Sequence, residues 1–190
     1  EPPDQLKLKA EFVERRGEEI KQLAKTNTPQ KSQRLKEAAG LLKQDLDAVK
    51  TQLHTVAAES SAPKAVEVAK DIDAKSGRLA QTLKEVKEVV PEDVKANVGE
   101  VQSAAMNAGV KAVQVLIEKH GDPAVQNLVS NDDLKRAVSE HVQGLEDGIG
   151  DTAKKVAEAT GGGLAIIDAK TSIGLLPPIA SGTVAFPAEA

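Results

Sequence analysis

The sequence has no cysteine, no tryptophan and no tyrosine, and its 190 residues include only two phenylalanines and one methionine. The missing cysteines exclude a disulfide framework, a thiolate zinc site and a cysteine nucleophile. A nucleic-acid-binding surface needs a basic face or stacking aromatic rings, and a formal net charge of −4 with so few aromatics supplies neither. No apolar run approaches the ~18 residues of a membrane-spanning helix. The core must therefore be built from Val, Leu, Ile and Ala, which suit closely packed helices better than a deep ligand pocket.

Apolar residues recur along most of the chain at alternating spacings of four and three. This spacing places them in one stripe along a helix, and a helix buries such a stripe against other helices. The two clearest stripes consist of Leu35, Ala39, Leu42, Leu46, Val49, Leu53 and Val56, and of Ala65, Ala69, Ile72, Ser76, Leu79, Leu83, Val86 and Val90. Three further stripes consist of Leu6, Ala10, Val13, Gly17, Ile20 and Ala24, of Val94, Val98, Val101, Ala105, Ala108, Ala112 and Val115, and of Leu134, Val138, Val142, Leu145, Ile149, Ala153 and Val156.

Proline, glycine and capping residues between the stripes predict where the helices begin and end. We expect long helices at about residues 4–26, 29–58, 62–90, 92–119 and 132–159, and a short helical piece at 123–129. Asp4 is expected to cap the first helix, and Thr28 to cap the second with Pro29 at its first position. Pro91 cannot continue a preceding helical turn, so we expect a sharp bend or hairpin there.

Gly17 is the one member of the first stripe that has no side chain. A glycine in a helix interior costs about 1 kcal/mol relative to alanine. It marks either a close approach of a neighbouring helix or a tolerated weak spot, and the sequence favours neither interpretation.

Residues 164–190 differ in kind from the rest of the chain, with three charged residues, three prolines and short apolar, β-branched segments. Disordered tails are usually charged and poor in Ile, Val and Leu. We therefore expect an extended arm that is buried against its own bundle or against a neighbouring copy, with disorder as the remaining alternative. Apolar extended segments are one means of adding a strand between subunits. The candidate self-association residues are Leu164, Ile166, Ile167, Ile173, Leu175, Val184 and Phe186.

Together these patterns predict an all-α fold. We expect an antiparallel bundle of four to five long amphipathic helices in residues 1–160, followed by an extended, apolar, β-prone C-terminal arm in residues 161–190. The three consecutive glycines at 161–163 follow a predicted helix, do not open one, and are interpreted as a hinge between these two parts rather than as a phosphate-binding loop.

One segment resembles a known family. Residues 83–98, Leu-Lys-Glu-Val-Lys-Glu-Val-Val-Pro-Glu-Asp-Val-Lys-Ala-Asn-Val, continue through Ser103, Gly109 and Ala112 to Leu116. With the earlier helix at residues 8–16, they resemble a bacterial domain of unknown function, family 5667, over about residues 4–118. The resemblance implies a helical domain outside the cytoplasm and no catalytic residues to transfer. The C-terminal arm departs from the family pattern.

The sequence offers no residue set that predicts catalysis, a cofactor or a metal site. His54, His120 and His141 lie far apart along the chain, and none has a second histidine at helical spacing. Asp4, Glu11, Glu14, Glu18 and Glu19 alternate with Lys and Arg, which is typical of a charged helix surface. Asp132 and Asp133 are interpreted as a helix cap that matches the helix dipole.

The predicted function is therefore non-enzymatic. We expect a secreted or cell-surface structural protein that contacts other chains, and in the sharper form of the hypothesis it assembles into a polymer through its C-terminal arm. The alternative is an extracytoplasmic regulatory or sensing domain that binds a partner protein or an envelope component. Partner helices are favoured over a membrane surface because the stripes are narrow and lack aromatic anchors. The start at Glu1-Pro2-Pro3 fits removal of a signal peptide, and it also fits a trimmed chain.

Overall fold

The computed structural model describes residues 2–141, which form five α-helices and one short 3₁₀ helix, with no strand in that range. The elements are α1 (Pro2–Lys25), α2 (Lys31–Glu59), α3 (Ala62–Val89), α4 (Glu92–Lys119), η1 (Pro123–Val125) and α5 (Asn131–Glu140). The predicted all-α fold is thus confirmed. A first compact unit ends at Ser130, and α5 belongs to a second unit. The predicted hinge at residues 161–163 and the arm lie outside the described residues.

Two of the predicted helix starts are wrong. Asp4 does not cap α1, because the helix already includes Pro2 and places Asp4 within its first turn. Thr28 and Pro29 do not open α2 either. The Lys31 N–H donates to the Thr28 carbonyl at 3.1 Å, which closes a turn over Pro29 and Gln30 before the helix begins. The other long helices of the first unit begin and end within about one residue of the predicted positions.

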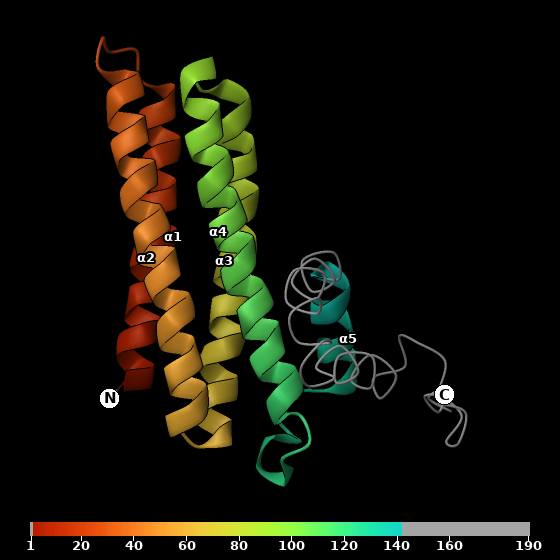
Figure 1. The fold of residues 1–190 in the computed structure, drawn as a ribbon. Coiled ribbons are helices and arrows are strands. Elements are labelled where there is room, and N and C mark those ends of the chain that lie inside the picture. The colour runs from red at the N-terminus through yellow and green to blue at the C-terminus, as the bar shows by residue number, and fades with distance from the viewer. Residues whose placement is uncertain (1, 142–190) are drawn as a thin grey trace, which may run out of the picture. The chain divides into compact units, whose positions relative to one another are not determined.

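The first unit is a four-helix bundle in which consecutive helices run in opposite directions (Figure 1). α1 packs against α2 and α3, and α4 packs against the same two helices. Although α2 and α3 follow one another in the chain, they make few contacts and lie on a diagonal of the bundle. The neighbours α1 and α3 therefore run parallel to each other, as do α2 and α4. This arrangement refines the predicted antiparallel bundle.

The interior of the bundle consists of the four predicted stripes. Every stripe residue of α1, α2, α3 and α4 is buried, including Gly17 and Ser76. The structure also explains Gly17, because a methyl group added there would overlap the Cδ1 atom of Leu79 on α3. Gly17 therefore leaves room for the Leu79 side chain of α3 to pack against α1. At the far end of α4, η1 packs on α3, and Lys70 Nζ donates to the Leu128 carbonyl at 2.7 Å.

The two turns on either side of α3 have the same backbone conformation. Ser60 and Ser61 join α2 to α3 with φ, ψ of −99°, 160° and −59°, 149°. Val90 and Pro91 join α3 to α4 with −82°, 157° and −54°, 149°. Proline fixes φ near the value that the second position of both turns adopts. The predicted hairpin at Pro91 is confirmed, and the preset φ of proline favours a turn that Ser60 and Ser61 adopt without it.

The second unit is described only by α5 and His141. α5 begins with Asp132 and Asp133 in its first turn, which places acidic side chains at the positive end of the helix dipole. The predicted helix over residues 132–159 is seen as far as Glu140, and its remainder lies outside the described residues. None of the helices within residues 2–141 combines the length and the hydrophobicity that crossing a membrane requires.

Candidate functional site

Two surfaces of the first unit are candidates for function: a charged groove between α1 and α3 and an apolar seam between α1 and α2. The predicted self-association residues at 164–186 lie outside the described residues. His54 is exposed on α2, and His120 follows α4 with a buried Nδ1 atom that has no hydrogen-bond partner in residues 2–141. No histidine lines the charged groove or the hollow of the apolar seam.

A ladder of ion pairs joins α1 to its parallel neighbour α3. Arg78 Nε lies 2.5 Å from Glu14 Oε1, and Lys21 Nζ lies 3.0 Å from Glu85 Oε2; each pair joins residues 64 positions apart. Lys75 and Glu11 follow the same offset, at 3.9 Å. Lys7 pairs with Glu67 at one helical turn less. A shared offset is what two parallel helices in fixed register produce, and three of these four pairs share the offset of 64.

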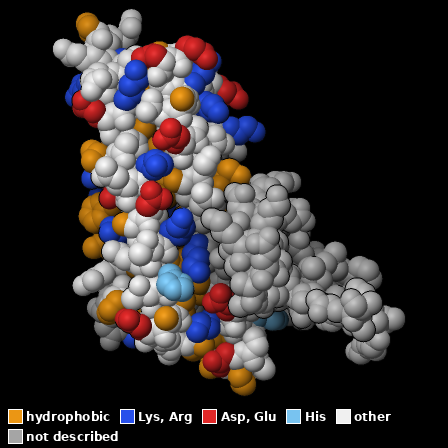
Figure 2. Space-filling view, viewed as in Figure 1, with side chains coloured by type: hydrophobic (Ala, Val, Ile, Leu, Met, Phe, Trp, Pro, Cys, Tyr) orange, Lys and Arg blue, Asp and Glu red, His pale blue; other side chains and the backbone are white. Residues whose placement is uncertain are grey.

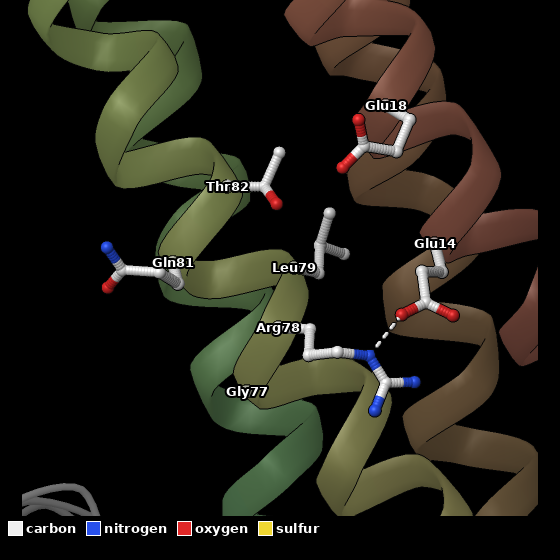
Figure 3. Close-up of a pocket in the computed structure, with 7 residues that line it drawn as sticks. All are labelled: Glu14, Glu18, Gly77, Arg78, Leu79, Gln81 and Thr82. Atoms are coloured by element: carbon white, nitrogen blue, oxygen red, sulfur yellow. Dashed lines mark hydrogen bonds and ion pairs between the residues drawn. The ribbon is translucent and has the colours of Figure 1, made fainter.

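The groove opens where one rung of this ladder is missing (Figure 3). At the same offset of 64, Glu18 on α1 faces Thr82 on α3, a side chain without charge. Leu79 forms the floor, Arg78 is held by Glu14, and a hollow of about 510 Å³ lies above them. The carboxylate of Glu14 is already paired with the guanidinium of Arg78, and such ion pairs are common where two helices pack together. We interpret this groove as a consequence of the incomplete ladder.

The exposed ion pairs shift the pKa values of their members. A hydrogen bond from Lys21 and its positive charge lower the pKa of Glu85, and the same pair raises the pKa of Lys21. Lys36 on α2 lowers the pKa of Asp93 on α4 through a hydrogen bond, across a distance of 2.7 Å. Both carboxylates therefore stay charged to lower pH than usual. The Lys21–Glu85 pair joins α1 to its parallel neighbour α3, and the Lys36–Asp93 pair joins α2 to its parallel neighbour α4.

The second surface lies on the outer side of the bundle, where α1 meets α2. An ion pair joins the two helices on this side: Arg16 Nη1 on α1 lies 2.6 Å from Asp45 Oδ2 on α2. Phe12 precedes Arg16 by four residues and follows the same side of α1, and Leu8, one turn earlier, lies about 80° further round the helix, toward solvent. Leu41 precedes Asp45 by four residues and follows the same side of α2 in the same way. We call the row of Leu8, Phe12, Leu23, Ala38 and Leu41 the α1/α2 seam.

The α1/α2 seam exposes an unusual amount of apolar side chain. Leu8, Phe12 and Leu41 are 53%, 50% and 52% exposed, and they are three of the six large hydrophobic residues exposed within residues 2–141. Hydrophobic side chains come to the surface along the left edge of the bundle, beside α1 and α2, whereas charges of both signs cover much of the visible face (Figure 2). Single exposed apolar residues are normal, but clustered ones are typical of an interaction surface.

The seam contains a hollow and an aromatic anchor. The hollow, about 280 Å³, lies between α1 and α2 and is lined by Arg16, Glu19, Ile20, Leu23, Ala38 and Leu41. Phe12 lies about one helical turn before Arg16, and the guanidinium of Arg15 lies 5.6 Å from the centre of the Phe12 ring. Arginine and aromatic side chains are enriched among the residues that dominate binding energy at interfaces. This surface is suited to holding apolar side chains of another segment.

No family model, no curated protein and no solved structure matches the chain. The resemblance of residues 4–118 to family 5667 is not tested by these comparisons and stays a prediction.

Proposed function

We propose that the chain is a non-catalytic structural protein, secreted or displayed at the cell surface, that associates with other copies of itself through residues 164–190. The observation that carries this proposal is the closed interior of the four-helix bundle. That interior is filled by the buried apolar side chains of its own four helices. The apolar side chains of residues 164–190 must then find cover elsewhere, because apolar surface in water is unfavourable.

The composition of the described surface supports the same function. The seam presents apolar side chains and an arginine-covered aromatic ring, which suit contact with another chain. The polymer form of the hypothesis follows if an arm on one copy binds a different surface on the next. Such an asymmetric contact leaves a free arm at one end and a free receiving surface at the other, and growth continues unless the contacts close into a ring.

The experiment is a comparison of molecular mass by sedimentation velocity for the complete chain and for a chain that ends at residue 163. We expect species larger than a monomer for the complete chain and a monomer for the shortened one. Circular dichroism of both proteins checks that the helices are retained. A monomer in both cases would overturn self-association through the arm.

The second candidate is an extracytoplasmic regulatory or sensing domain that binds a partner protein or an envelope component. It is favoured by the resemblance of residues 4–118 to family 5667 and by the exposed seam, which accommodates a foreign chain as readily as a copy. It becomes the better account if the complete chain is monomeric at every concentration.

A further inference from the structure

The connection between α2 and α3 joins two helices that make few contacts with each other. Ser60 and Ser61 form this connection, and both have an extended backbone. The helices on either side lie on a diagonal of the bundle (Figure 1). The first unit therefore divides into two hairpins, α1 with α2 and α3 with α4, which meet where α1 packs against α3 and α2 packs against α4. The chain crosses from one hairpin to the other only through Ser60 and Ser61.

We propose that two copies of the chain exchange these hairpins, so that α1 and α2 of one copy pack against α3 and α4 of the other. This inference goes beyond the self-association proposed above, because it uses residues 2–130 alone. A domain-swapped pair keeps the contacts of the closed form outside its hinge. Ion pairs between the hairpins, such as Lys21 with Glu85 and Lys36 with Asp93, form again with the second copy.

The balance between the closed and the exchanged form depends on protein concentration. The two forms share the packing of the hairpins, so they differ in the connection and in the freedom of movement that two chains lose when they pair. High concentration therefore favours the exchanged dimer. Exchange also requires the hairpins to separate, so it takes place as chains refold together and not between folded monomers.

The turn between α3 and α4 shows why the hinge lies at Ser60 and Ser61. The two turns have nearly the same dihedral angles, so this turn conformation does not by itself hold two helices together. α3 and α4 make the most extensive contact in the bundle, which keeps their turn closed, and Pro91 fixes one of its φ angles. Ser61, in contrast, is exposed, and its hydroxyl makes no capping hydrogen bond. A hollow of about 430 Å³ also lies beside the connection.

The segment that follows α4 moves together with the second hairpin. η1 packs on α3, and Lys70 Nζ on α3 donates to the Leu128 carbonyl at 2.7 Å. Both contacts join parts of residues 62–130. Exchange at Ser60 and Ser61 therefore breaks neither of them.

The native ion pairs report which hairpins are paired. Unlabelled and isotope-labelled complete chains are mixed in equal amounts, unfolded in urea and refolded at high concentration, and a carbodiimide then joins neighbouring ammonium and carboxylate groups. Lys21 and Glu85 lie 3.0 Å apart across the two hairpins, and in the dimer we expect about half of their links to join a light and a heavy peptide. Lys75 and Asp71, 2.7 Å apart within α3, are the matched control, and their links should never be mixed. Absence of a dimer, or a dimer with only unmixed Lys21–Glu85 links, would overturn the exchange.

Lengthening the connection tests the hinge itself. A flexible Gly-Ser-Gly-Ser insertion between Ser60 and Ser61 lets the two hairpins of one chain meet more freely, at a high effective concentration. The fraction of exchanged dimer after refolding should therefore fall several-fold. The same insertion between Val90 and Pro91 lies inside the second hairpin and should leave this fraction unchanged. Equal effects of the two insertions would overturn the assignment of the hinge to Ser60 and Ser61.

The same links separate this inference from the proposed function. Association through residues 164–190 leaves each bundle closed, so its oligomers carry unmixed Lys21–Glu85 links and are lost in the chain that ends at residue 163. Exchanged dimers carry mixed links and persist in that shortened chain after refolding. Arm-dependent oligomers with unmixed links alone would overturn the exchange and leave the proposed function standing. Mixed links without arm-dependent oligomers would support the exchange and overturn the proposed function.

Discussion

Replacing Gly17 by alanine tests the packing of the bundle at its closest point. The change has two opposing effects on the free energy of unfolding. Alanine is favoured over glycine in a helix interior by about 1 kcal/mol. The new methyl group would also overlap the Cδ1 atom of Leu79, a side chain that is only 2% exposed and would have to shift. Overpacking of this kind costs about 1–3 kcal/mol, so the sum ranges from neutral to about 2 kcal/mol destabilising.

Gly40 on α2 provides the matched control, because a methyl group added there would meet no atom within 4 Å. Gly40→Ala should therefore stabilise the protein by about 1 kcal/mol, which leaves a difference of about 1–3 kcal/mol between the two sites. Urea denaturation followed by far-UV circular dichroism measures both, since the absence of tryptophan and tyrosine leaves little intrinsic fluorescence to follow.

A double-mutant cycle with Leu79 assigns the cost to the proposed contact. Leu79→Ala alone should destabilise the protein by about 2–5 kcal/mol, as expected for a buried leucine. In that background the clash is gone, and Gly17→Ala should regain the stabilisation of about 1 kcal/mol seen at Gly40. If Gly17→Ala stabilises the protein as much as Gly40→Ala does with Leu79 intact, the tight packing of Leu79 over Gly17 is refuted.

Further predictions concern the turns, the ladder and pH. Ser61→Pro should stabilise the protein by about 0.4–1 kcal/mol in urea denaturation, because Ser61 has nearly the backbone conformation of Pro91; destabilisation would show that the two turns differ in a way the dihedral angles do not reveal. Thr82→Lys should complete the missing rung opposite Glu18 and add at most about 1 kcal/mol of stability that disappears in high salt, with Thr82→Gln as the uncharged control; a gain that persists in high salt would exclude an ion pair. The lowered pKa values of Glu85 and Asp93 contribute stability that is complete above their ordinary values of 4.5 and 3.8 and is lost as pH falls through the lowered values. The raised pKa of Lys21 contributes stability that is complete below 10.5 and is lost as pH rises through the raised value. The double variant Lys21→Gln, Glu85→Gln should therefore have a flatter dependence of melting temperature on pH at both extremes, and an unchanged pH profile would contradict the role of this pair.

The sequence predicts the helices and their buried faces well because both depend on local spacing. Each stripe residue of α1 to α4 is buried, since an apolar residue at every third or fourth position leaves a helix one favourable orientation. The predicted start of α2 is wrong for a local reason. Proline is favourable at the first helical position but equally so in a turn, and here the turn closed by Thr28 and Lys31 is formed.

The arrangement of the helices and the seam could not be predicted in the same way. A stripe shows that a helix is buried but does not identify its neighbours. The parallel pairing of α1 with α3 is matched by charges 64 residues apart, a regularity that is recognised only once the neighbours are known. Leu8 and Phe12 lie outside the stripe of α1, and two apolar residues on a polar face are too common to indicate a binding surface. The structure makes them informative by placing Leu41 of α2 on the same seam.

The central claim, that the chain assembles with copies of itself, is tested most directly by sedimentation equilibrium of the unmodified complete chain over a wide range of concentrations. We expect the mean mass to rise with concentration above that of a monomer, and to pass that of a dimer where the arm of one copy binds a different surface on the next and the contacts do not close into a ring. A mean mass that stays at that of the monomer throughout the series would contradict the claim.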